Sequence, residues 1–586
     1  MRQTDKLREK ILSQDPTSEQ IDAIFTTESE FLLRASPGSG KTWTSCRRFI
    51  WRGANWESKV GGIALLSFTN AAIREFHEAT IKVEQRELLS DPNFIGTFDS
   101  FVERFIITPF GHLVSGLAKR PRLYIAPRPG DWKNTKLHTW SQLKNRKWIK
   151  VPAWEMIPFP GNGVTAFMSS KEYGGKALAF AAHNPIEEFF KLGLYTHQQR
   201  VYLAHRILIA RPQIAKCISR RFPEVVIDEA QDTNIWLLIL LDLLRQNGTK
   251  VTLVGDPDQC IYEFSFADAQ SLTVLKTKWQ IPEKPLSKSF RCNNPIAESV
   301  RNISGNNSFI GCGPNKNEHQ RAFVIREATD TRFSHSIKEF ERLLERAGIS
   351  QSDSVILCRG HQQLETIRGE VSYTDLKGLT KKLAQAAFYR DARKDYRKAF
   401  EIVVNVIREM VDEPELWESI DNEPDSESSL RVRLALWKFA KSSDGLPPIY
   451  RNCTLWIENL KNNLTGVFAE IGITNLPTIG QKIKRTGLSA SQLTLPLFEP
   501  QTLFPPIRQE TIHQVKGESI DGVLVLGSAK FFNEVVKTVE NDENGEERRL
   551  AYVAMTRARY ALLVGLPASH FDKHIAAWKH WGFGVL

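Results

Sequence analysis

Residues 31–42 read FLLRASPGSGKT and combine an apolar run with a glycine-rich stretch that ends in Lys and Thr. Residues 31–34 predict a buried strand, residues 35–42 a glycine-rich turn, and residues 43–51 a helix. A turn in this setting is typical of a P-loop, in which backbone N–H groups and a helix N-terminus bind phosphates. Lys41 would then reach the β and γ oxygens, and the Thr42 hydroxyl would bind Mg²⁺. The sequence therefore predicts an α/β fold with an ATP site.

A second stretch, residues 224–229 (EVVIDE), ends a run of β-branched residues with two carboxylates. Parallel strands present metal-binding acids at their carboxyl ends, so we expect Asp228 to hold Mg²⁺. Glu229, one residue further on, is placed to orient and deprotonate an attacking water. Adjacent carboxylates are otherwise usually surface charge, but the strand that leads directly into this pair favours a site.

The spacing of these elements indicates two insertions. The interval from Lys41 to Asp228 is longer than one nucleotide-binding sheet needs, and a similar interval follows a strand at residues 354–359. The second interval begins with a stretch of helical period, so we expect a mainly helical insertion there. The predicted boundaries are 1–106 and 221–284 for core 1, 107–220 for its insertion, 285–365 and 508–586 for core 2, and 366–507 for the second insertion.

Composition narrows the class of protein. The 586 residues are 41% hydrophobic and 25% charged, enough for several packed domains. The net charge of +11 fits a polyanionic partner, although a merely soluble surface explains it equally well. Seven scattered cysteines without a C-x-x-C pair disfavour disulfides, zinc fingers and clustered iron–sulfur sites. The charged N-terminus and the short apolar runs predict no signal peptide and no membrane span, and so a cytoplasmic protein.

Several further segments carry a family resemblance. Residues 228–232 (DEAQD) resemble the second motif of the UvrD, Rep and PcrA helicases of superfamily 1, and residues 254–262 (VGDPDQCIY) resemble the third. The order continues along the chain with residues 16–20 (PTSEQ) for the Q motif, 66–72 (LSFTNAA) for Ia, 96–101 (GTFDSF) for the next, 286–291 (LSKSFR) for IV, 511–518 (TIHQVKGE) for V and 546–558 (EERRLAYVAMTRA) for VI. This many motifs in the family's order is very specific.

The resemblance implies an architecture and an ATP site. It implies two RecA-like parallel-sheet P-loop cores, each with an inserted mainly helical domain, and ATP in the cleft between them. The residues implied to bind ATP are Gln20, Ser36, Pro37, Gly38, Ser39, Gly40, Lys41, Thr42, Phe290 and, if the loop shifts by one residue, Glu518. Those implied to act in hydrolysis with Lys41, Asp228 and Glu229 are Gln259, as a sensor of the γ-phosphate, and Arg291 and Arg557, which would reach across the cleft.

The same resemblance implies contacts to single-stranded DNA. The implied residues are Phe68, Thr69, Asn70, Thr97, Tyr262, Phe264 and His513. Phe68, Tyr262 and Phe264 occupy base-stacking positions, although each would also suit an ordinary core. The chain departs from the family's usual residues at three places: Ala71 stands for Lys, Asp99 for His, and Phe264-Ser265 for Trp-Arg. These departures put the local DNA contacts in question and leave the ATP site intact.

The first insertion contains a basic, aromatic stretch. Residues 119–150 hold ten Lys or Arg, one acid (Asp131), and Trp132, Trp140 and Trp148 spaced eight apart. This composition is typical of a nucleic-acid surface, with Lys144, Arg146 and Lys147 as its densest charge. A packed subdomain with core tryptophans and solvated charges fits equally well.

The motifs together predict an ATP- and Mg²⁺-dependent helicase or translocase on single-stranded DNA, or on DNA with a single-stranded tail. The resemblance implies 3′ to 5′ movement, in DNA repair or anti-phage defence. One alternative is a DNA-sensing ATPase subunit of a nuclease complex, like the helicase subunit of Gabija-type defence systems, with little unwinding of its own. The other alternative is a P-loop protein acting on RNA.

Overall fold

The chain forms two compact units in a computed structural model, Met1–Gly360 with Ile507–Leu586, and His361–Pro506. The structure describes residues 3–57, 60–117, 119–124, 134–142, 148–161, 164–169, 177–178, 184–261, 271–304, 308–315, 317–327, 333–360, 363–364, 367, 378–391, 394–411, 417, 427–448, 453–473, 479–483 and 507–586. None of the helices within these residues is long and apolar enough to cross a membrane.

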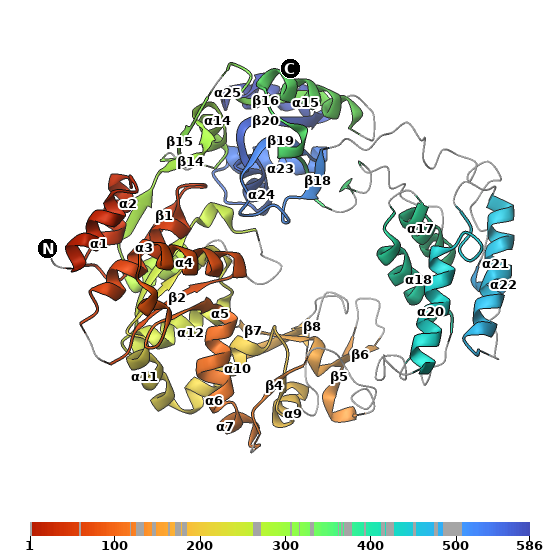
Figure 1. Ribbon diagram of the computed structural model, residues 1–586, viewed down its shortest axis with the longest axis horizontal. Helices are drawn as coiled ribbons and strands as arrows, with labels where there is room; N and C mark the ends of the chain where they lie inside the picture. The colour runs from red at the N-terminus through yellow and green to blue at the C-terminus, as the bar shows by residue number, and fades with distance from the viewer. Residues whose placement is uncertain are drawn as a thin grey trace. The chain divides into compact units, whose positions relative to one another are not determined.

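Core 1 is a six-stranded, all-parallel sheet in the order β13-β1-β12-β11-β2-β3. Its strands are β1 (Phe31–Ala35), β2 (Ile63–Ser67), β3 (Phe94–Thr97), β11 (Glu224–Ile227), β12 (Lys250–Gly255) and β13 (Glu283–Leu286). Helices flank the sheet: α1 (Gln3–Leu12), α2 (Ser18–Phe25), α3 (Lys41–Ala54), α4 (Asn70–Lys82), α5 (Phe98–Val102), α12 (Ile235–Gln246) and α13 (Ser271–Trp279) (Figure 1). The strand, the turn and the helix predicted from residues 31–51 are therefore present as β1, the P-loop and α3.

Alternate residues of the central strands enter two different hydrophobic clusters. Leu32 and Leu66 lie in the cluster that includes α12, whereas Leu33 and Leu65 lie in the cluster that includes α3 and α4. A parallel strand that is covered on both faces needs a nearly continuous run of apolar residues. This requirement explains the apolar sequences of β1, β2 and β11.

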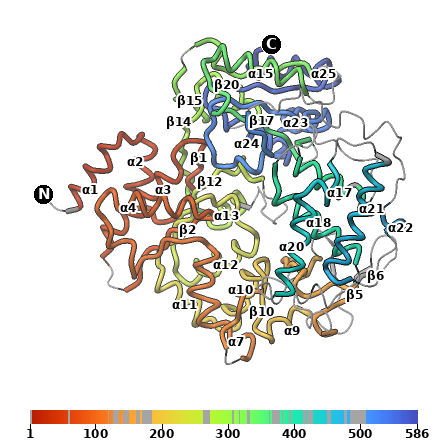
Figure 2. The backbone as a smooth tube through the Cα atoms, turned by 45° about the vertical axis from the view of Figure 1, so that its right-hand side comes forward, coloured from red at the N-terminus to blue at the C-terminus, as the bar shows by residue number. Residues whose placement is uncertain are grey.

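Core 2 repeats this plan in the order β18-β17-β19-β20-β16-β21, again all parallel. Its strands are β16 (Ala322–Glu327), β17 (Ser354–Cys358), β18 (Arg508–Thr511), β19 (Ile520–Leu526), β20 (Ala558–Pro567) and β21 (Gly584–Val585), with β14 (Lys288–Asn293) and β15 (Ile310–Gly313) as a separate pair. Its helices are α14 (Asn294–Ser304), α15 (Ser334–Ala347), α23 (Ala529–Glu540), α24 (Glu546–Met555) and α25 (Ala568–His580). Figure 2 shows how two distant stretches of sequence, green and blue, build this one core. The predicted fold class of two parallel-sheet cores is confirmed.

The segment between α5 and β11 mixes helices with antiparallel strands, whereas a mainly helical insertion was expected. Its helices are α6 (Thr108–Phe110), α7 (His112–Ser115), α9 (Pro185–Lys191), α10 (Arg200–Ala210) and α11 (Pro212–Arg221). Its strands are β4 (Arg122–Leu123), β5 (His138–Gln142), β6 (Trp148–Pro152), β7 (Met156–Gly161), β8 (Val164–Ser169), β9 (Ala177–Leu178) and β10 (Leu194–Tyr195), of which β5–β6 and β7–β8–β9 pair antiparallel. Pro158 and Pro160 lie in β7, which is an edge strand and therefore tolerates proline. Because proline is unusual in strands, these residues obscured the strand pattern in the sequence.

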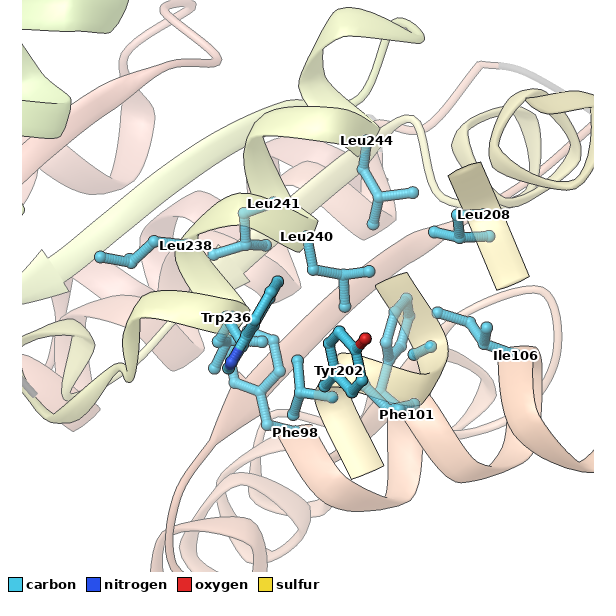
Figure 3. Packing of buried hydrophobic residues seen from close by; sticks show 14 of the residues in the cluster. Phe98, Phe101, Ile106, Tyr202, Leu208, Trp236, Leu238, Leu240, Leu241 and Leu244 are labelled. Atoms are coloured by element: carbon cyan, nitrogen blue, oxygen red, sulfur yellow. The ribbon is translucent and has the colours of Figure 1, made fainter. Parts of the chain in front are cut away.

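This segment shares a hydrophobic core with core 1. Figure 3 shows Phe98 and Phe101 of α5 packing beside Tyr202 of α10 and Trp236 of α12. The Trp236 indole N–H also donates to the Pro158 carbonyl at 2.7 Å. The segment is therefore anchored on α12 and on α5, the helix that follows the carboxyl end of β3.

The second unit is helical in its described part. It contains α17 (Leu379–Asp391), α18 (Tyr396–Met410), α20 (Glu427–Lys441), α21 (Cys453–Glu470) and α22 (Ile479–Lys482). These helices enclose a hydrophobic core of their own, with Phe388, Leu436 and Trp456 among its buried members.

Candidate functional site

The P-loop lies between β1 and α3 and touches core 2. Gly40 adopts a φ of +78° as it caps α3, and Gly38 adopts +71°. A Cβ atom on Gly38 would lie 2.5 Å from the Cβ of Arg291 in core 2. Because this conformation and this approach both exclude larger residues, glycine is required where the two cores meet.

Two carboxylates at the end of β11 face the P-loop. The Thr42 hydroxyl donates to Asp228 Oδ2 at 3.0 Å, and the Ser45 hydroxyl donates to Asp228 Oδ1 at 3.4 Å. The Lys41 ammonium lies 3.4 Å from Glu229 Oε2. These groups lie far apart along the chain, and the fold brings them together at the carboxyl edge of the sheet.

The two carboxylates have opposite pKa shifts. Complete burial, together with repulsion from Glu229, raises the pKa of Asp228. Burial also acts to raise the pKa of Glu229, but Lys41 and Lys516 outweigh it and hold that pKa well below its usual range. Glu229 also has a φ of +56°, a left-handed conformation that is uncommon for a residue other than glycine. One carboxylate of the pair therefore stays ionised, which is the form that can accept a proton.

The oxygens of Thr42 and Asp228 suit a magnesium ion. Mg²⁺ prefers hard oxygen ligands and usually takes only one or two from protein, completing its shell with phosphate and water. A fully buried carboxylate with a raised pKa, next to a hydroxyl, fits such an ion. Within the described residues there is no group of three or more His, Cys, Asp or Glu side chains that would hold a metal without a nucleotide.

Core 2 brings two arginines to the same cleft. The Arg291 guanidinium donates from Nε to Ser519 Oγ at 2.7 Å and from Nη2 to the Gly517 carbonyl at 3.3 Å. Arg557 Nη2 donates to Gln259 Oε1 at 3.1 Å, and Gln259 Nε2 donates to Asp256 Oδ2 at 2.6 Å. Burial, with repulsion from Arg291, lowers the pKa of Arg557 to about 9, so the guanidinium remains a cation at neutral pH. A chain of hydrogen bonds thus joins core 2 to the end of β12.

An ion pair that the sequence did not single out also crosses the cleft. The Lys516 ammonium lies 2.5 Å from Asp232 Oδ1, and both side chains are about nine-tenths buried. Burial raises the pKa of Asp232 to about 6 although Lys516 acts against that rise. Both residues lie inside motifs that the sequence matched, but nothing local indicates that they pair.

Residues of both cores line one cavity of about 840 Å³. Its lining is Gly38, Gly40, Lys41, Thr42, Trp43, Phe68, Thr69, Ala71, Ala72, Glu75, Asp228, Glu229, Asp232, Gln259, Arg291, Lys516, Gly517, Glu518 and Arg557. Trp43 and Glu75 were not predicted as site residues. Trp43 could have been found from its position, because it is an aromatic residue directly after the P-loop. All six residues expected to act in hydrolysis lie in this lining.

Two family models match the chain. The model described as the UvrD/REP helicase N-terminal domain matches residues 17–151 and 168–280, and the UvrD-like helicase C-terminal domain matches residues 454–568. This chain belongs to the UvrD-like helicases. The resemblance inferred from the motifs is confirmed, and the protein is a superfamily 1 DNA helicase that depends on ATP.

Curated relatives agree with this family. DNA helicase II of Escherichia coli is 23% identical over 93% of this chain and 83% of its own length. DNA helicase II of Salmonella typhimurium is 22% identical with the same coverage of both chains. The ATP-dependent DNA helicase PcrA of Staphylococcus epidermidis is 23% identical over 67% of this chain and 54% of its own length.

Of the residues expected around the base and ribose of ATP, only Glu518 belongs to the cavity lining. The Gln20 amide accepts from the Thr17 backbone N–H at 2.9 Å and donates to the Ser39 carbonyl at 3.1 Å, so it braces the P-loop. Phe290 is half exposed and lies outside the cavity lining. Glu518 lines the cavity, but its carboxylate pairs with Arg508. Ser36, Pro37 and Ser39 form the P-loop without lining the cavity.

The residues expected to bind DNA follow β2 and β3. Thr69 caps α4 by accepting from the Ala72 N–H, and Thr97 caps α5 by accepting from the Ser100 N–H. Thr69 and Asn70 are exposed, whereas Phe68 is half-buried and packs on Phe98 with ring centroids 5.6 Å apart. The described residues of core 1 that were expected to contact DNA therefore share one edge of the sheet.

Other expected DNA contacts are placed differently or fall outside the described chain. A His513 ring nitrogen lies 3.2 Å from the Ile261 carbonyl, and burial lowers the pKa of this histidine. Tyr262, Phe264, Trp132, Lys144, Arg146 and Lys147 lie outside the described residues. Trp140 of the basic stretch is 59% exposed, so it is a surface residue rather than a core one.

Proposed function

We propose that this helicase hydrolyses ATP in the cleft between its two cores and uses the energy to move 3′ to 5′ along single-stranded DNA. One observation carries the assignment of the hydrolysis site: the P-loop and carboxylates of core 1 face two arginines of core 2 across one cavity. The proposed 3′ to 5′ direction rests on the family resemblance. A site divided in this way responds to the distance between the cores. Hydrolysis and core movement are then coupled by geometry.

The proposed chemistry assigns one task to each side chain. Lys41 neutralises the β and γ phosphate oxygens, which releases it from Glu229. Glu229 is held ionised, so it orients the attacking water and accepts its proton. Gln259 and the two arginines contact the γ-phosphate, where charge grows in the transition state.

Thr42 and Asp228 are the proposed magnesium ligands, with the Ser45 hydroxyl supporting the Asp228 carboxylate from behind. Held there with the nucleotide, Mg²⁺ would supply positive charge that offsets part of the negative charge of the phosphates. Burial and the neighbouring Glu229 raise the pKa of Asp228, so a cation bound beside this carboxylate would stabilise its ionised form.

DNA with a single-stranded tail is the proposed substrate. The exposed Thr69 and Asn70, with Thr97 on the adjoining strand, provide hydroxyl and amide donors for phosphates, and Phe68 provides a ring beside them. We assign the tail to this edge because it adjoins the ATP cavity, in which Phe68 and Thr69 take part.

An unwinding assay with paired substrates tests the proposal. A duplex with a 3′ tail, its 5′-tailed counterpart and a 3′-tailed RNA duplex of the same sequence are each mixed with the chain, ATP and Mg²⁺. We expect unwinding of the 3′-tailed DNA alone, lost in Lys41→Ala. Preference for the 5′ tail would contradict the polarity, and preference for RNA would contradict the substrate class.

We also propose that the protein acts in the cytoplasm, either in DNA repair or in anti-phage defence. DNA-stimulated ATPase without unwinding by the chain alone would favour the alternative, an ATPase subunit of a nuclease complex. Co-purification with a nuclease would support that alternative, and vigorous unwinding by the lone chain would exclude it.

A further inference from the structure

Arg200, at the start of α10, is a buried cation beside the predicted DNA edge. Only 7% of its side chain is exposed. Its Nη1 lies 2.6 Å from Asp99 Oδ2, its Nε lies 3.5 Å from Glu103 Oε2, and its Nη2 lies 3.0 Å from a His197 ring nitrogen. A guanidinium removed from water in this way needs anionic partners in every state of the protein.

The two carboxylates that pair with Arg200 differ in how firmly other side chains fix them in place. Glu103 accepts hydrogen bonds from the Tyr195 hydroxyl at 2.7 and 2.6 Å, and from the Thr108 hydroxyl at 3.4 Å. Tyr195 is fully buried, and this burial with the Glu103 contact raises its pKa, so the hydroxyl keeps its proton and keeps donating. Glu103 is therefore fixed in place.

Asp99 is the exchangeable partner. Its side chain is 59% exposed, and in the part of the chain that the structure describes Arg200 is the cation it pairs with. An exposed aspartate forms a weak ion pair because water solvates it well in either arrangement. Arg200 needs an anion at this position, but nothing in the contacts requires that anion to be Asp99.

The position of this pair connects it to the DNA edge. Asp99 follows Thr97, the last residue of β3, by two positions, and Thr97 pairs in register with Ser67 of β2. Figure 3 shows Phe98 and Phe101, on either side of Asp99 in sequence, packed beside Tyr202 of α10. The arginine and the exposed edge are thus held together by a rigid core.

We propose that Arg200 is a binding site for one phosphate of the DNA strand, occupied by Asp99 until the strand arrives and displaces it. This inference rests on the proposed function, since the strand must run along the edge formed by β2 and β3. Asp99 then lowers the affinity for DNA in two ways, by repelling the backbone and by occupying the cation. Strand binding at this site is an exchange of one anion for another.

The variant Asp99→Asn tests the exchange directly. Binding of a fluorescent oligothymidylate by the full chain is measured across a salt series. We expect about fivefold tighter binding at low salt, the factor that one unit charge exerts at about 4 Å in water. The slope of log K against log salt steepens by about 0.7, the value for one more phosphate contact on a single strand.

Asp91→Asn is the matched control. Asp91 is 66% exposed and also pairs with an arginine, Arg221 at 2.6 Å, but it precedes β3 and so lies at the opposite edge of the sheet. Asp91→Asn changes the net charge by the same amount as Asp99→Asn. We expect it to leave the affinity for the oligothymidylate and the salt slope unchanged. An equal gain in both variants would reduce the effect to net charge and overturn the inference.

A double variant tests whether the gain passes through Arg200. Asp99→Asn with Arg200→Gln removes the cation as well as its aspartate, so we expect the salt slope to return to its wild-type value. Only the part of the gain in affinity that comes from the lost repulsion should remain. Thermal unfolding checks that each variant is folded. Unchanged or weaker binding by Asp99→Asn would overturn the inference while leaving the proposed function intact. A wild-type chain that binds no single strand would overturn the proposed function, and this inference with it.

Discussion

Core 1 and core 2 share a scaffold but divide the chemistry. Each is a six-stranded parallel sheet flanked by helices. Core 1 supplies the lysine and the carboxylates at the ends of β1 and β11, whereas core 2 supplies the arginines that reach them. The comparison teaches that neither core holds a complete site, so the activity depends on how the two surfaces meet.

A large effect on activity is expected from core 1. Glu229→Gln removes the proposed base but keeps the shape, so we expect kcat for ATP hydrolysis to fall by about 10²–10⁴-fold with little change in KM. Glu75→Gln is the matched control, because Glu75 lines the same cavity without an ion pair to Lys41. Steady-state hydrolysis with single-stranded DNA measures both. Equal losses in the two variants would contradict the assignment of the base.

The contact between the cores should contribute measurably to stability. Lys516→Met leaves Asp232 buried without its partner, and we expect a loss of about 3–5 kcal/mol, the usual cost of breaking a buried pair from one side. Adding Asp232→Leu should recover most of that loss, since an apolar pair needs no compensation. Urea unfolding of the two single variants and the double variant measures the coupling. Additive losses would show that the two side chains do not interact.

The stability of core 2 should depend on pH through one buried histidine, His570. Burial, with repulsion from His574 and Lys573, lowers the pKa of His570 to about 4, whereas the unfolded chain gains this proton near pH 6.5. The unfolded state therefore binds more protons between these values, and stability falls as the pH drops from 7 to 4 by at most about 3 kcal/mol. Thermal unfolding of wild type and His570→Gln at pH 7 and pH 5 tests this, with His580→Gln, an exposed histidine at the end of the same helix, as control. A slope that persists in His570→Gln would place its origin elsewhere.

The parts that the sequence predicted are those with local signals. An apolar run that leads into a glycine-rich turn gave β1, the P-loop and α3, and a β-branched run that ends in two acids gave β11. These signals exist because the chemistry of phosphate and metal binding restricts residue types within a few positions. The strands of the first insertion were missed, since the prolines of β7 obscure the alternation that identifies a strand.

The cross-cleft contacts could not be predicted from local pattern. Lys516 pairs with Asp232, and Arg557 bonds to Gln259, across hundreds of residues of sequence. Their distances follow from the docking of two sheets, which no single motif encodes. The same holds for Arg200, which lies in a segment where the sequence drew attention to tryptophans and lysines instead.

We propose that core 2 completes the ATP site of core 1 through Arg557. The most direct test is the rate of ATP hydrolysis, at saturating single-stranded DNA, by Arg557→Ala and by Arg559→Ala. Arg559 lies two residues away, is partly exposed and pairs with Asp521 outside the cleft, so it matches the change in charge without the contact. We expect turnover to fall at least about 10³-fold in Arg557→Ala, because this arginine would stabilise phosphoryl transfer, and to stay near the wild-type rate in Arg559→Ala. DNA-stimulated turnover that survives in Arg557→Ala would contradict it.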